Sequence, residues 1–181
     1  VLPSALQAAS VHMPIFVPGG NTAEASLASA TIYAANSLCE VVAHLKGISL
    51  LEPCRPEAPV AGESQYPDLA DVRGQWQAKR ALEIAAAGGH NILFSGPPGT
   101  GKSMLAQRLP GILPPPSSEE SIETAAVNSV LGRSIDLASW RRRPFRAPHH
   151  TASAASLIGG GAEAKPGEVS RAHNGVLFLD E

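Results

Sequence analysis

Eight consecutive residues near the middle of the chain read Gly96-Pro97-Pro98-Gly99-Thr100-Gly101-Lys102-Ser103. They match the pattern G-x-x-x-x-G-K-[ST], in which glycines let successive backbone N–H groups curl around a phosphate chain. The apolar run Ile92-Leu93-Phe94 comes just before the motif, and a helical pattern starts at Lys102. A strand, a glycine-rich loop and a helix in this order predict a phosphate-binding loop, and a glycine-rich turn without a ligand is the alternative.

Two side chains of the motif have specific roles in such a loop. We expect Lys102 to reach the β- and γ-phosphates of a nucleotide as a positive point charge. We expect Ser103 to hold Mg²⁺ through its hydroxyl group.

A second apolar run, Val176-Leu177-Phe178-Leu179, is followed by Asp180 and Glu181. Four apolar residues predict a buried central strand whose carboxyl end places Asp180 beside the phosphate loop, where its carboxylate holds the magnesium shell. We expect Glu181 to face the γ-phosphate and to orient and deprotonate the attacking water. Acidic residues often end strands, so the pattern has weight only because it follows a phosphate loop.

The segments around the motif complete the expected fold. Residues 75–87 place apolar side chains on one helix face, and Gly88-Gly89 supplies a left-handed stop. Residues 104–109 continue the helix after the loop until Pro110 breaks it. Two apolar runs separated by helices, each buried on both faces, predict a parallel sheet in an α/β layer fold.

The segment after residue 116 is expected to be helical at first and rich in loops later. Ser117 and Glu120 have the spacing of a capping pair for a helix that reaches about residue 131. The glycines at 159–161 and the pair Pro166-Gly167 mark loops.

The N-terminal third has its own pattern. Residues 11–17 predict an edge-type strand, and the spacing of Asn21 and Glu24 predicts a helix over residues 21–36. A second short helix is expected over residues 38–45. The prolines of residues 51–67 are too dense for helix or sheet and predict a linker.

Composition narrows the class of protein. The 181-residue chain is 44% hydrophobic and 17% charged, with a formal net charge of −2. It has no run of about 18 apolar residues and no secretion signal, so neither a membrane span nor export is expected. Cys39 and Cys54 are expected to be free thiols in a reducing cytoplasm. Because the chain starts at Val1 and ends at Asp180-Glu181, we expect a piece of a longer protein.

Charge is unevenly distributed: residues 1–63 have a net charge of −3 and the remainder +1. Five arginines lie within fourteen residues, namely Arg133, Arg141, Arg142, Arg143 and Arg146. A cluster of this kind is usually a solvated face and otherwise an anion-binding patch.

Four further side chains could carry chemistry. A metal ion shared by His149 and His150 is not expected, because neighbours in a strand point to opposite sides. Trp76 and Trp140 are expected to be packing residues rather than platforms on which bases stack.

Beyond single motifs, residues 69–181 resemble the magnesium chelatase-like AAA+ ATPases of the ComM type. The segments that carry this resemblance are Asp71-Val72-Arg73-Gly74-Gln75, Lys79-Arg80-Ala81-Leu82-Glu83, Ala86-Ala87-Gly88-Gly89-His90-Asn91, the phosphate loop, Pro144-Phe145-Arg146-Ala147-Pro148-His149-His150-Thr151, Gly159-Gly160-Gly161, Pro166-Gly167-Glu168 and Ala172-His173-Asn174-Gly175 with the run that follows. The resemblance implies ATP and Mg²⁺ as cofactors and a homo-oligomeric ring of the hexamer type.

The resemblance also implies roles for other residues. Val72, Gly74 and Gln75 occupy the positions that approach the adenine. Residues 154–173 occupy the position of a hairpin inserted in helix 2, which points toward the pore of the ring. Four arginines, Arg141, Arg142, Arg143 and Arg146, precede this segment, so they are candidates for sequence-independent contacts to nucleic-acid phosphates.

Residues 1–50 resemble the C-terminal part of a Lon-protease-like domain of the ribosomal-S5 type. Pro3 stands where an active Lon domain has its catalytic lysine, and no lysine occurs before Lys46. We therefore expect no peptidase activity. The expected division is residues 1–50 for this domain, 51–68 for the linker, and 69–181 for the N-terminal part of an AAA+ domain.

Three functions are consistent with these features. The first is an ATP-driven motor that acts on DNA, by branch migration or helicase movement during recombination of incoming DNA. The second is the ATPase subunit of a magnesium chelatase, and the third is a nucleotide-gated chaperone or scaffold. The resemblance places the sensor, arginine-finger and lid residues beyond Glu181, so we expect negligible ATP turnover from these 181 residues alone.

Overall fold

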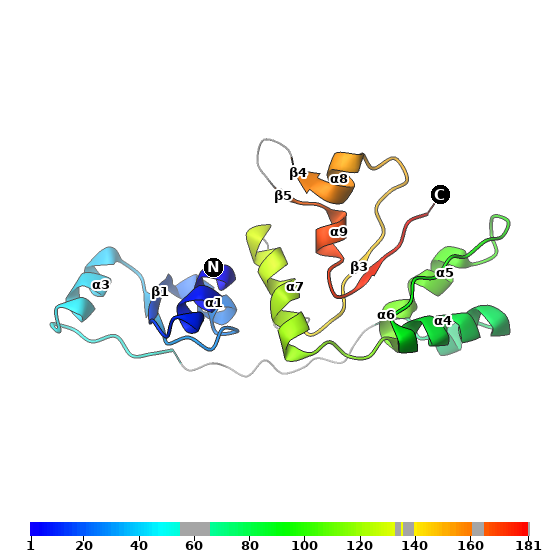
Figure 1. Ribbon diagram of the computed structural model, residues 1–181. Helices are drawn as coiled ribbons and strands as arrows, with labels where there is room; N and C mark the ends of the chain where they lie inside the picture. Colours follow the sequence, from blue (N-terminus) through cyan, green and yellow to red (C-terminus); the bar gives the residue numbers. More distant parts are fainter. Residues whose placement is uncertain (55–65, 133–134, 136–139, 161–164, 181) are drawn as a thin grey trace. The chain divides into compact units, whose positions relative to one another are not determined.

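The computed structural model describes residues 1–54, 66–132, 135, 140–160 and 165–180, which form two compact units (Figure 1). The first unit contains Val1–Ala61 and Ala125–Trp140, and the second contains Gly62–Thr124 and Arg141–Glu181. Most of the expected linker, from residue 55 to 65, lies outside the described residues. The two cysteines are free thiols.

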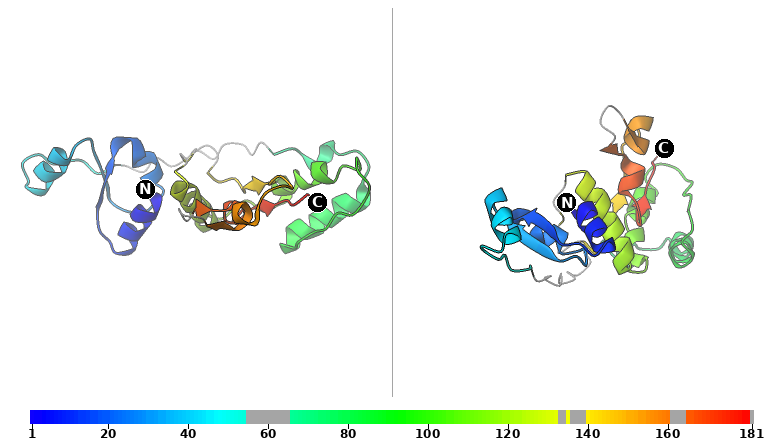
Figure 2. Two further views of the ribbon diagram at one scale, coloured as in Figure 1. Left: turned by 90° about the horizontal axis from the view of Figure 1, so that it is seen from above. Right: turned by 60° about the vertical axis from the view of Figure 1, so that its left-hand side comes forward.

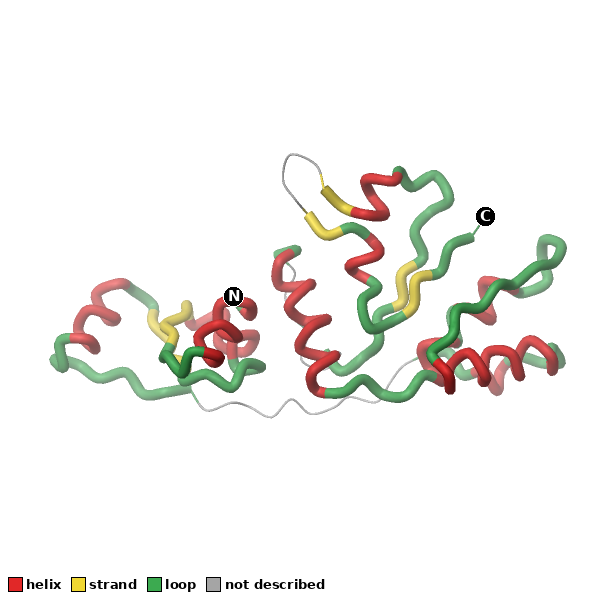
Figure 3. The backbone as a smooth tube through the Cα atoms, in the orientation of Figure 1, coloured by secondary structure: helices red, strands yellow, loops and turns green. Residues whose placement is uncertain are grey.

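The described strands pair in three two-stranded sheets, β1–β2, β3–β6 and β4–β5 (Figure 3). The first two pairs are parallel and the third is antiparallel. Helices surround these pairs, so the α/β class is confirmed at this level. The expected larger parallel sheet is present only as short pairs within the described residues.

No helix among the described residues combines the length and the hydrophobicity that crossing a bilayer requires.

The first unit is built on the parallel pair of β1 (Ile15–Pro18) and β2 (Ile32–Ala35), in which Ile15 lies opposite Ile32. Helix α1 (Leu2–Ser10), the short turn η1 (Gly19–Asn21) and helix α2 (Thr22–Ala25) accompany the pair. Its buried core consists of Leu2, Ala5, Val17, Ala25, Ala28, Ile32 and Ala125.

The prediction of a helix over residues 21–36 is correct for the first turn and wrong for the rest of the segment. Helix α2 ends at Ala25, and β2 occupies the second half of the segment. Asn21 makes no side-chain cap, and the Glu24 carboxylate instead accepts hydrogen bonds from Leu2 N and Ser129 Oγ. Ile32 is a β-branched residue with 3% exposure, and in the extended conformation it pairs with Ile15 of β1. Burial and strand pairing together outweigh the local helical pattern.

Helix α3 (Leu38–Leu45) confirms the second helix expected in this region. Ser37 precedes it, and its hydroxyl accepts a hydrogen bond from Glu40 N at 3.3 Å. A serine cap satisfies one of the backbone N–H groups that a helix start leaves without a partner. The expected strand is present as β1, but it begins at Ile15 rather than at Val11.

The second unit contains most of the helices. Its helical elements are η2 (Leu69–Asp71), α4 (Trp76–Gly88), α5 (Lys102–Ala106), α6 (Leu109–Ile112), the first half of α7 (Ser118–Val130), α8 (Ala154–Ile158) and α9 (Glu168–Arg171). A core of Leu69, Val72, Leu82 and Leu105 joins η2, α4 and α5. Gly89 ends α4 in the left-handed conformation, with φ of 63°, as expected from the glycine pair.

Two features of this unit differ from the expected pattern. The helix after the phosphate loop ends at Ala106, and Pro110 lies in the first turn of α6 rather than ending a helix. Proline is tolerated there because the first N–H groups of a helix have no partner within it.

The expected strand at Ile92-Leu93-Phe94 has no ladder among the described residues. Ile92 and Phe94 pack against the second core, whereas Leu93 is 90% exposed. The partner of β6 (Val176–Leu177) is instead β3 (Phe145–Arg146). The apolar run after Gly175 is also only half-buried, with Leu179 61% exposed. The prediction that the runs 92–94 and 176–179 are buried on both faces is therefore wrong.

The β3–β6 pair depends on a close backbone approach. Val176 N donates a hydrogen bond to Pro144 O at 2.8 Å, and Phe178 N donates to Arg146 O at 2.8 Å. The rings of Phe145 and Phe178 stack with centroids 6.3 Å apart. A Cβ atom on Gly175 would lie 2.1 Å from Pro144 O, so only glycine fits between the strands.

We therefore predict that Gly175→Ala destabilises the second unit by about 1–3 kcal/mol, because the strands must move apart to admit the methyl group. Urea unfolding followed by circular dichroism measures this loss. Gly132→Ala provides a control for the loss of a glycine, since a Cβ atom there would meet nothing within 4 Å and the cost is only that of its φ of 68°. An unchanged unfolding midpoint for Gly175→Ala would contradict the close approach.

A hairpin interrupts the helical segment near the C-terminus. Strands β4 (Gly159–Gly160) and β5 (Lys165–Pro166) pair antiparallel between α8 and α9, which lie side by side (Figure 2). A Cβ atom on Gly167 would lie 2.3 Å from Gly159 N, which explains a glycine at this narrow neck. The hairpin expected between residues 154 and 173 is confirmed, while its tip at 161–164 lies outside the described residues.

Trp76 does not pack in a core. It is 77% exposed on α4, so the expectation of a packing role is wrong for this residue. The helix turns small and aliphatic side chains, among them Ala78 and Leu82, toward the second core and leaves Trp76 on another face.

Candidate nucleotide-binding site

The phosphate loop adopts a tight curl that its glycines permit. Gly99 and Gly101 have φ angles of 80° and 86°, in the left-handed region that other residues rarely adopt. Gly101 is the residue from which α5 begins, so the helix starts at Lys102 as the motif predicts. Within the curl, the Thr100 hydroxyl donates a hydrogen bond to Pro97 O at 2.9 Å.

The Lys102 side chain lies inside this curl. Its ammonium group donates hydrogen bonds to Gly96 O at 2.9 Å and to Pro97 O at 3.2 Å. A phosphate oxygen carries negative charge and a carbonyl oxygen does not, so a phosphate attracts the ammonium more strongly than these two carbonyls do. The lysine is therefore positioned to exchange two carbonyls for an anion.

Ser103 and Asp180 are neighbours in space. The Ser103 hydroxyl donates a hydrogen bond to Asp180 Oδ2 at 3.2 Å, although the two residues are 77 positions apart in the sequence. A hydroxyl and a carboxylate are hard oxygen ligands of the kind that Mg²⁺ prefers, so this pair fits the expected cation. Glu181, the expected catalytic group, lies outside the described residues.

The segment before α4 contacts the phosphate loop. Gln75 Nε2 donates a hydrogen bond to Thr100 O at 3.1 Å, and Gln75 itself has a positive φ of 55°. Val72 is 2% exposed and belongs to the second core. Gln75 is thus brought to the loop, whereas Val72 supports the segment from the interior.

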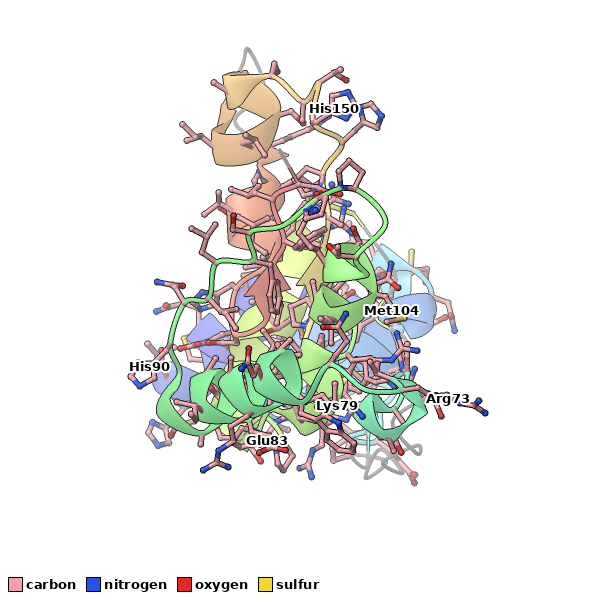
Figure 4. The ribbon with its side chains drawn as sticks, turned by 90° about the vertical axis from the view of Figure 1, so that its right-hand side faces the viewer. Arg73, Lys79, Glu83, His90, Met104 and His150 are labelled. Carbon is pink, nitrogen blue, oxygen red and sulfur yellow. The ribbon has the colours of Figure 1, made fainter. Side chains whose placement is uncertain are left out.

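A cavity of about 740 Å³ adjoins the loop. It lies between the extended segment 91–96 and the segment 175–180, and Lys102 and Asp180 are both part of its wall. His90, which Figure 4 shows at the end of α4 opposite Arg73, also lines it. Its size is within the range of small-molecule sites.

Arg143 connects three segments of the second unit. Its guanidinium donates hydrogen bonds to Pro114 O at 2.6 Å and Asn174 O at 2.7 Å, and it forms an ion pair with Glu120 at 3.2 Å. The side chain is only 13% exposed. These contacts hold the turn at Asn174 that leads into β6 and on to Asp180.

The other candidate arginines do not form one free basic surface. Arg146 Nε forms an ion pair with Glu168 at 2.6 Å, and Arg171 contacts the same carboxylate. Arg141 Nη2 donates a hydrogen bond to Ser118 Oγ at 3.3 Å, while Arg142 is partly buried. Arg143 and Arg146 are therefore engaged in contacts within the unit, which argues against direct phosphate contacts from these two.

The environment of Glu120 makes the second unit sensitive to acid. Hydrogen bonds from Ser117 N at 2.7 Å and from Arg143 lower the pKa of the Glu120 carboxyl below its ordinary value of 4.5. A carboxyl with a lowered folded-state pKa stabilises the fold above pH 4.5, and this stability is lost as the pH falls through the lower value.

We predict that Glu120→Gln unfolds at a lower temperature than the wild type at pH 7, and that the difference shrinks below pH 4.5. Thermal melts followed by circular dichroism across this range measure it. Glu119→Gln, one residue earlier in the same helix turn, is the matched control. A difference that grows toward acid pH would contradict the assignment.

The two adjacent histidines do not point to opposite sides. The ring centroids of His149 and His150 are 4.1 Å apart, because these residues lie in a turn rather than in a strand. The geometric reason given for excluding a shared metal ion is therefore wrong. Among the described residues there is no group of three or more His, Cys, Asp or Glu side chains suited to a metal ion.

Comparison with known proteins identifies the family. Residues 68–181 match the family described as magnesium chelatase, subunit ChlI. This chain belongs to the magnesium chelatase-like, ComM-type family. Membership gives residues 68–181 an AAA+ P-loop fold of the α/β class and implies the use of a nucleotide and Mg²⁺.

Three relatives illustrate the similarity. The competence protein ComM of Haemophilus influenzae is 48% identical over 186 residues, which cover 100% of this chain and 36% of that protein. The uncharacterized protein YifB of Salmonella typhimurium is 51% identical over 180 residues, covering 98% and 35%. An uncharacterized protein of Mycobacterium tuberculosis is 49% identical over 185 residues, covering 100% and 37%. The chain thus spans about a third of the length of the relatives it matches.

Sequence reasoning missed the residues that support the site. Asn174 has a left-handed φ of 58°, and its side-chain amide donates hydrogen bonds to Glu120 O at 3.1 Å and Glu123 Oε2 at 2.9 Å. The Asn-Gly pair at 174 and 175 is a turn signal that could have indicated this conformation. Nothing in the sequence pairs Glu120 with Arg143, because their contact depends on tertiary structure.

Proposed function

We propose that this chain is the nucleotide-binding part of an ATP-hydrolysing AAA+ motor that acts on DNA. The observation that carries the ATPase part is the hydrogen bond between Ser103 and Asp180, beside the loop that encloses the Lys102 ammonium. A Mg²⁺-nucleotide site needs the hydroxyl of the phosphate loop and an aspartate from a distant strand close together, and this contact brings them together.

In this proposal each residue of the site has a separate role. The backbone of Gly96, Pro97, Pro98, Gly99, Thr100 and Gly101, together with Lys102, holds the phosphates. Ser103 and Asp180 hold Mg²⁺, which neutralises charge on the phosphate oxygens when it is bound. Glu181 orients the attacking water and accepts its proton. Val72 and Gln75 define the side on which the adenine lies.

The DNA part of the proposal rests on the competence protein among the relatives, since that name points to the handling of incoming DNA. Branch migration or helicase movement during recombination is the corresponding activity. Arg141 and Arg142, which belong to the same arginine cluster, remain candidates for phosphate contacts. We place the full-length protein in the cytoplasm as a homo-oligomeric ring, with the β4–β5 hairpin toward its pore.

The family description favours one alternative, an ATPase subunit that drives magnesium insertion into a porphyrin. Both functions need the same nucleotide site, so ATP binding cannot separate them. The substrate separates them: branched DNA should stimulate ATP hydrolysis by a motor, whereas a porphyrin should do so for a chelatase subunit. A nucleotide-gated scaffold would respond to neither.

The deciding experiment uses the purified full-length protein. We expect branched DNA at low salt to stimulate hydrolysis and ATP to drive strand displacement. The Glu181→Gln variant should retain bound ATP without hydrolysing it. The absence of any DNA response at low salt would refute the DNA-acting motor, while loss of ATP trapping in Glu181→Gln would refute the catalytic assignment.

For residues 1–50 we propose the C-terminal part of a Lon-protease-like domain of the S5 type, without peptidase activity. These residues form two paired strands with helices beside them, and Pro3, at the position of the catalytic lysine, lies in the first turn of α1. We expect the purified protein not to cleave casein, and measurable cleavage would refute this assignment.

A further inference from the structure

Helix α4 presents a face that the nucleotide site does not use. Lys79 and Arg80 lie three and four residues after Trp76, and Glu83 lies four residues after Lys79 and three after Arg80, which brings the four side chains to one side of the helix. Trp76 is 77% exposed, an unusual state for the largest aromatic side chain. Figure 4 shows Lys79 and Glu83 along α4 and Arg73 near its N-terminal end.

A cavity of about 550 Å³ lies against this face. Leu69 and Ile112 contribute apolar surface from η2 and α6, and Trp76 contributes its indole. No residue lines both this cavity and the cavity beside the phosphate loop, so the two are separate. The volume is within the range of small-ligand sites and is small for a docked helix or strand.

Charge around the indole favours an anionic ligand. Lys79 Nζ lies over one face of the Trp76 ring, 5.4 Å from its centroid. Glu83 is the acidic residue of the cavity wall, and its carboxylate is held by Arg80 at 2.9 Å. The wall therefore combines one planar aromatic surface with two cations and one paired carboxylate.

We propose that the Trp76 face of α4, defined by Trp76, Lys79 and Arg80, binds an unpaired base of single-stranded nucleic acid. The base stacks on the face of the indole that Lys79 does not cover, and Lys79 contacts the adjoining phosphate, while Arg80 stays paired with Glu83. Single-strand binding proteins use this combination of stacking and positive charge without reading sequence. The inference rests on the DNA part of the proposed function and gives it a contact site.

The two tryptophans of the chain permit a direct optical test. In a Trp140→Phe variant of the 181-residue chain, Trp76 is the remaining tryptophan and can be excited at wavelengths that the two tyrosines do not absorb. We expect an oligothymidine of about 15 nucleotides to quench its emission, because a stacked base lies against the indole. Quenching by free thymidine alone at the same base concentration should be weaker, since it lacks the phosphates.

Affinity measured with a fluorescein-labelled oligothymidine avoids any need for the Trp140 variant. Trp76→Ala should weaken binding by roughly 5-fold or more, and Trp76→Phe should restore part of it. Ile84→Ala is the matched control, because Ile84 is a 53% exposed apolar residue of the same helix that does not line the cavity. Lys79→Ala should reduce the slope of log affinity against log salt by about 0.7.

The outcomes separate this inference from the proposed function. Binding that is unchanged in Trp76→Ala and Lys79→Ala overturns the Trp76 face and leaves a DNA-acting motor intact. No binding by the chain, with stimulation of the full-length protein by DNA, likewise overturns the face alone. Concentration-dependent self-association that Trp76→Ala abolishes, with no response to oligothymidine, shows a protein interface instead.

Discussion

Replacing Lys102 by alanine is expected to weaken ATP binding roughly 10- to 100-fold, the range for loss of one hydrogen bond to a charged group. The Lys102 ammonium lies within the curl of the loop and donates to Gly96 O and Pro97 O. Alanine removes the positive charge that we expect to meet the β- and γ-phosphates. Titration of the 181-residue chain with a fluorescent ATP analogue in the presence of Mg²⁺ measures the effect.

Stability should change little in the same variant. The two carbonyl partners of Lys102 are in exposed positions, so water replaces the ammonium when the side chain is removed. The melting temperature is therefore the control for intact folding, and Lys165→Ala is the control for loss of a positive charge elsewhere. Wild-type affinity in Lys102→Ala would contradict the assignment of the phosphate loop.

Several elements were predictable because their signals are local. Helix α3 follows from the serine cap and apolar spacing within its own eight residues. Helix α4 stops at Gly89 because that residue adopts the left-handed conformation that its neighbours in the helix cannot. The capping pair of Ser117 and Glu120 exchanges hydrogen bonds in both directions, at 3.1 and 2.7 Å. In each case, the information lies within about one turn of the helix end.

Other elements depend on partners that are distant in sequence. Ile32 lies in a strand because it pairs with Ile15 of β1 and is buried there. Ile92-Leu93-Phe94 has an equally apolar pattern, yet no described strand pairs with it. A strand requires a hydrogen-bonded neighbour, and periodicity within one segment cannot identify that neighbour.

The same division holds within the candidate site. The expected proximity of Asp180 to the phosphate loop is confirmed by its contact with Ser103, because both motifs are local signals with a known spatial relation. The role expected for Arg143 was drawn from charge clustering and from its place before the segment 154–173. Burial and three directed contacts of its guanidinium instead indicate that it supports the turn before β6.

Replacing Arg143 by alanine is expected to destabilise the second unit by about 3 kcal/mol or more, counting only its hydrogen bonds to two backbone carbonyls. Pro114 O and Asn174 O would lose a charged donor, and Asn174 would lose one restraint on its left-handed conformation. Urea unfolding monitored by circular dichroism measures the loss. Arg143→Lys should recover only part of it, because one ammonium group cannot reproduce the directed donors of a planar guanidinium.

A readout at the nucleotide site distinguishes a positioning role from a loss of stability. Asn174 leads through β6 to Asp180, so a looser turn should displace Asp180 from Ser103 while leaving Lys102 in place. In Arg143→Lys at low temperature, where the chain remains folded, ATP should then bind with a weaker dependence on Mg²⁺. Its affinity without Mg²⁺ should stay close to that of the wild type. Arg80→Lys, a change at an exposed ion pair, is the matched control. Equal losses of ATP affinity with and without Mg²⁺ would show that Arg143 supports the fold but not the position of Asp180.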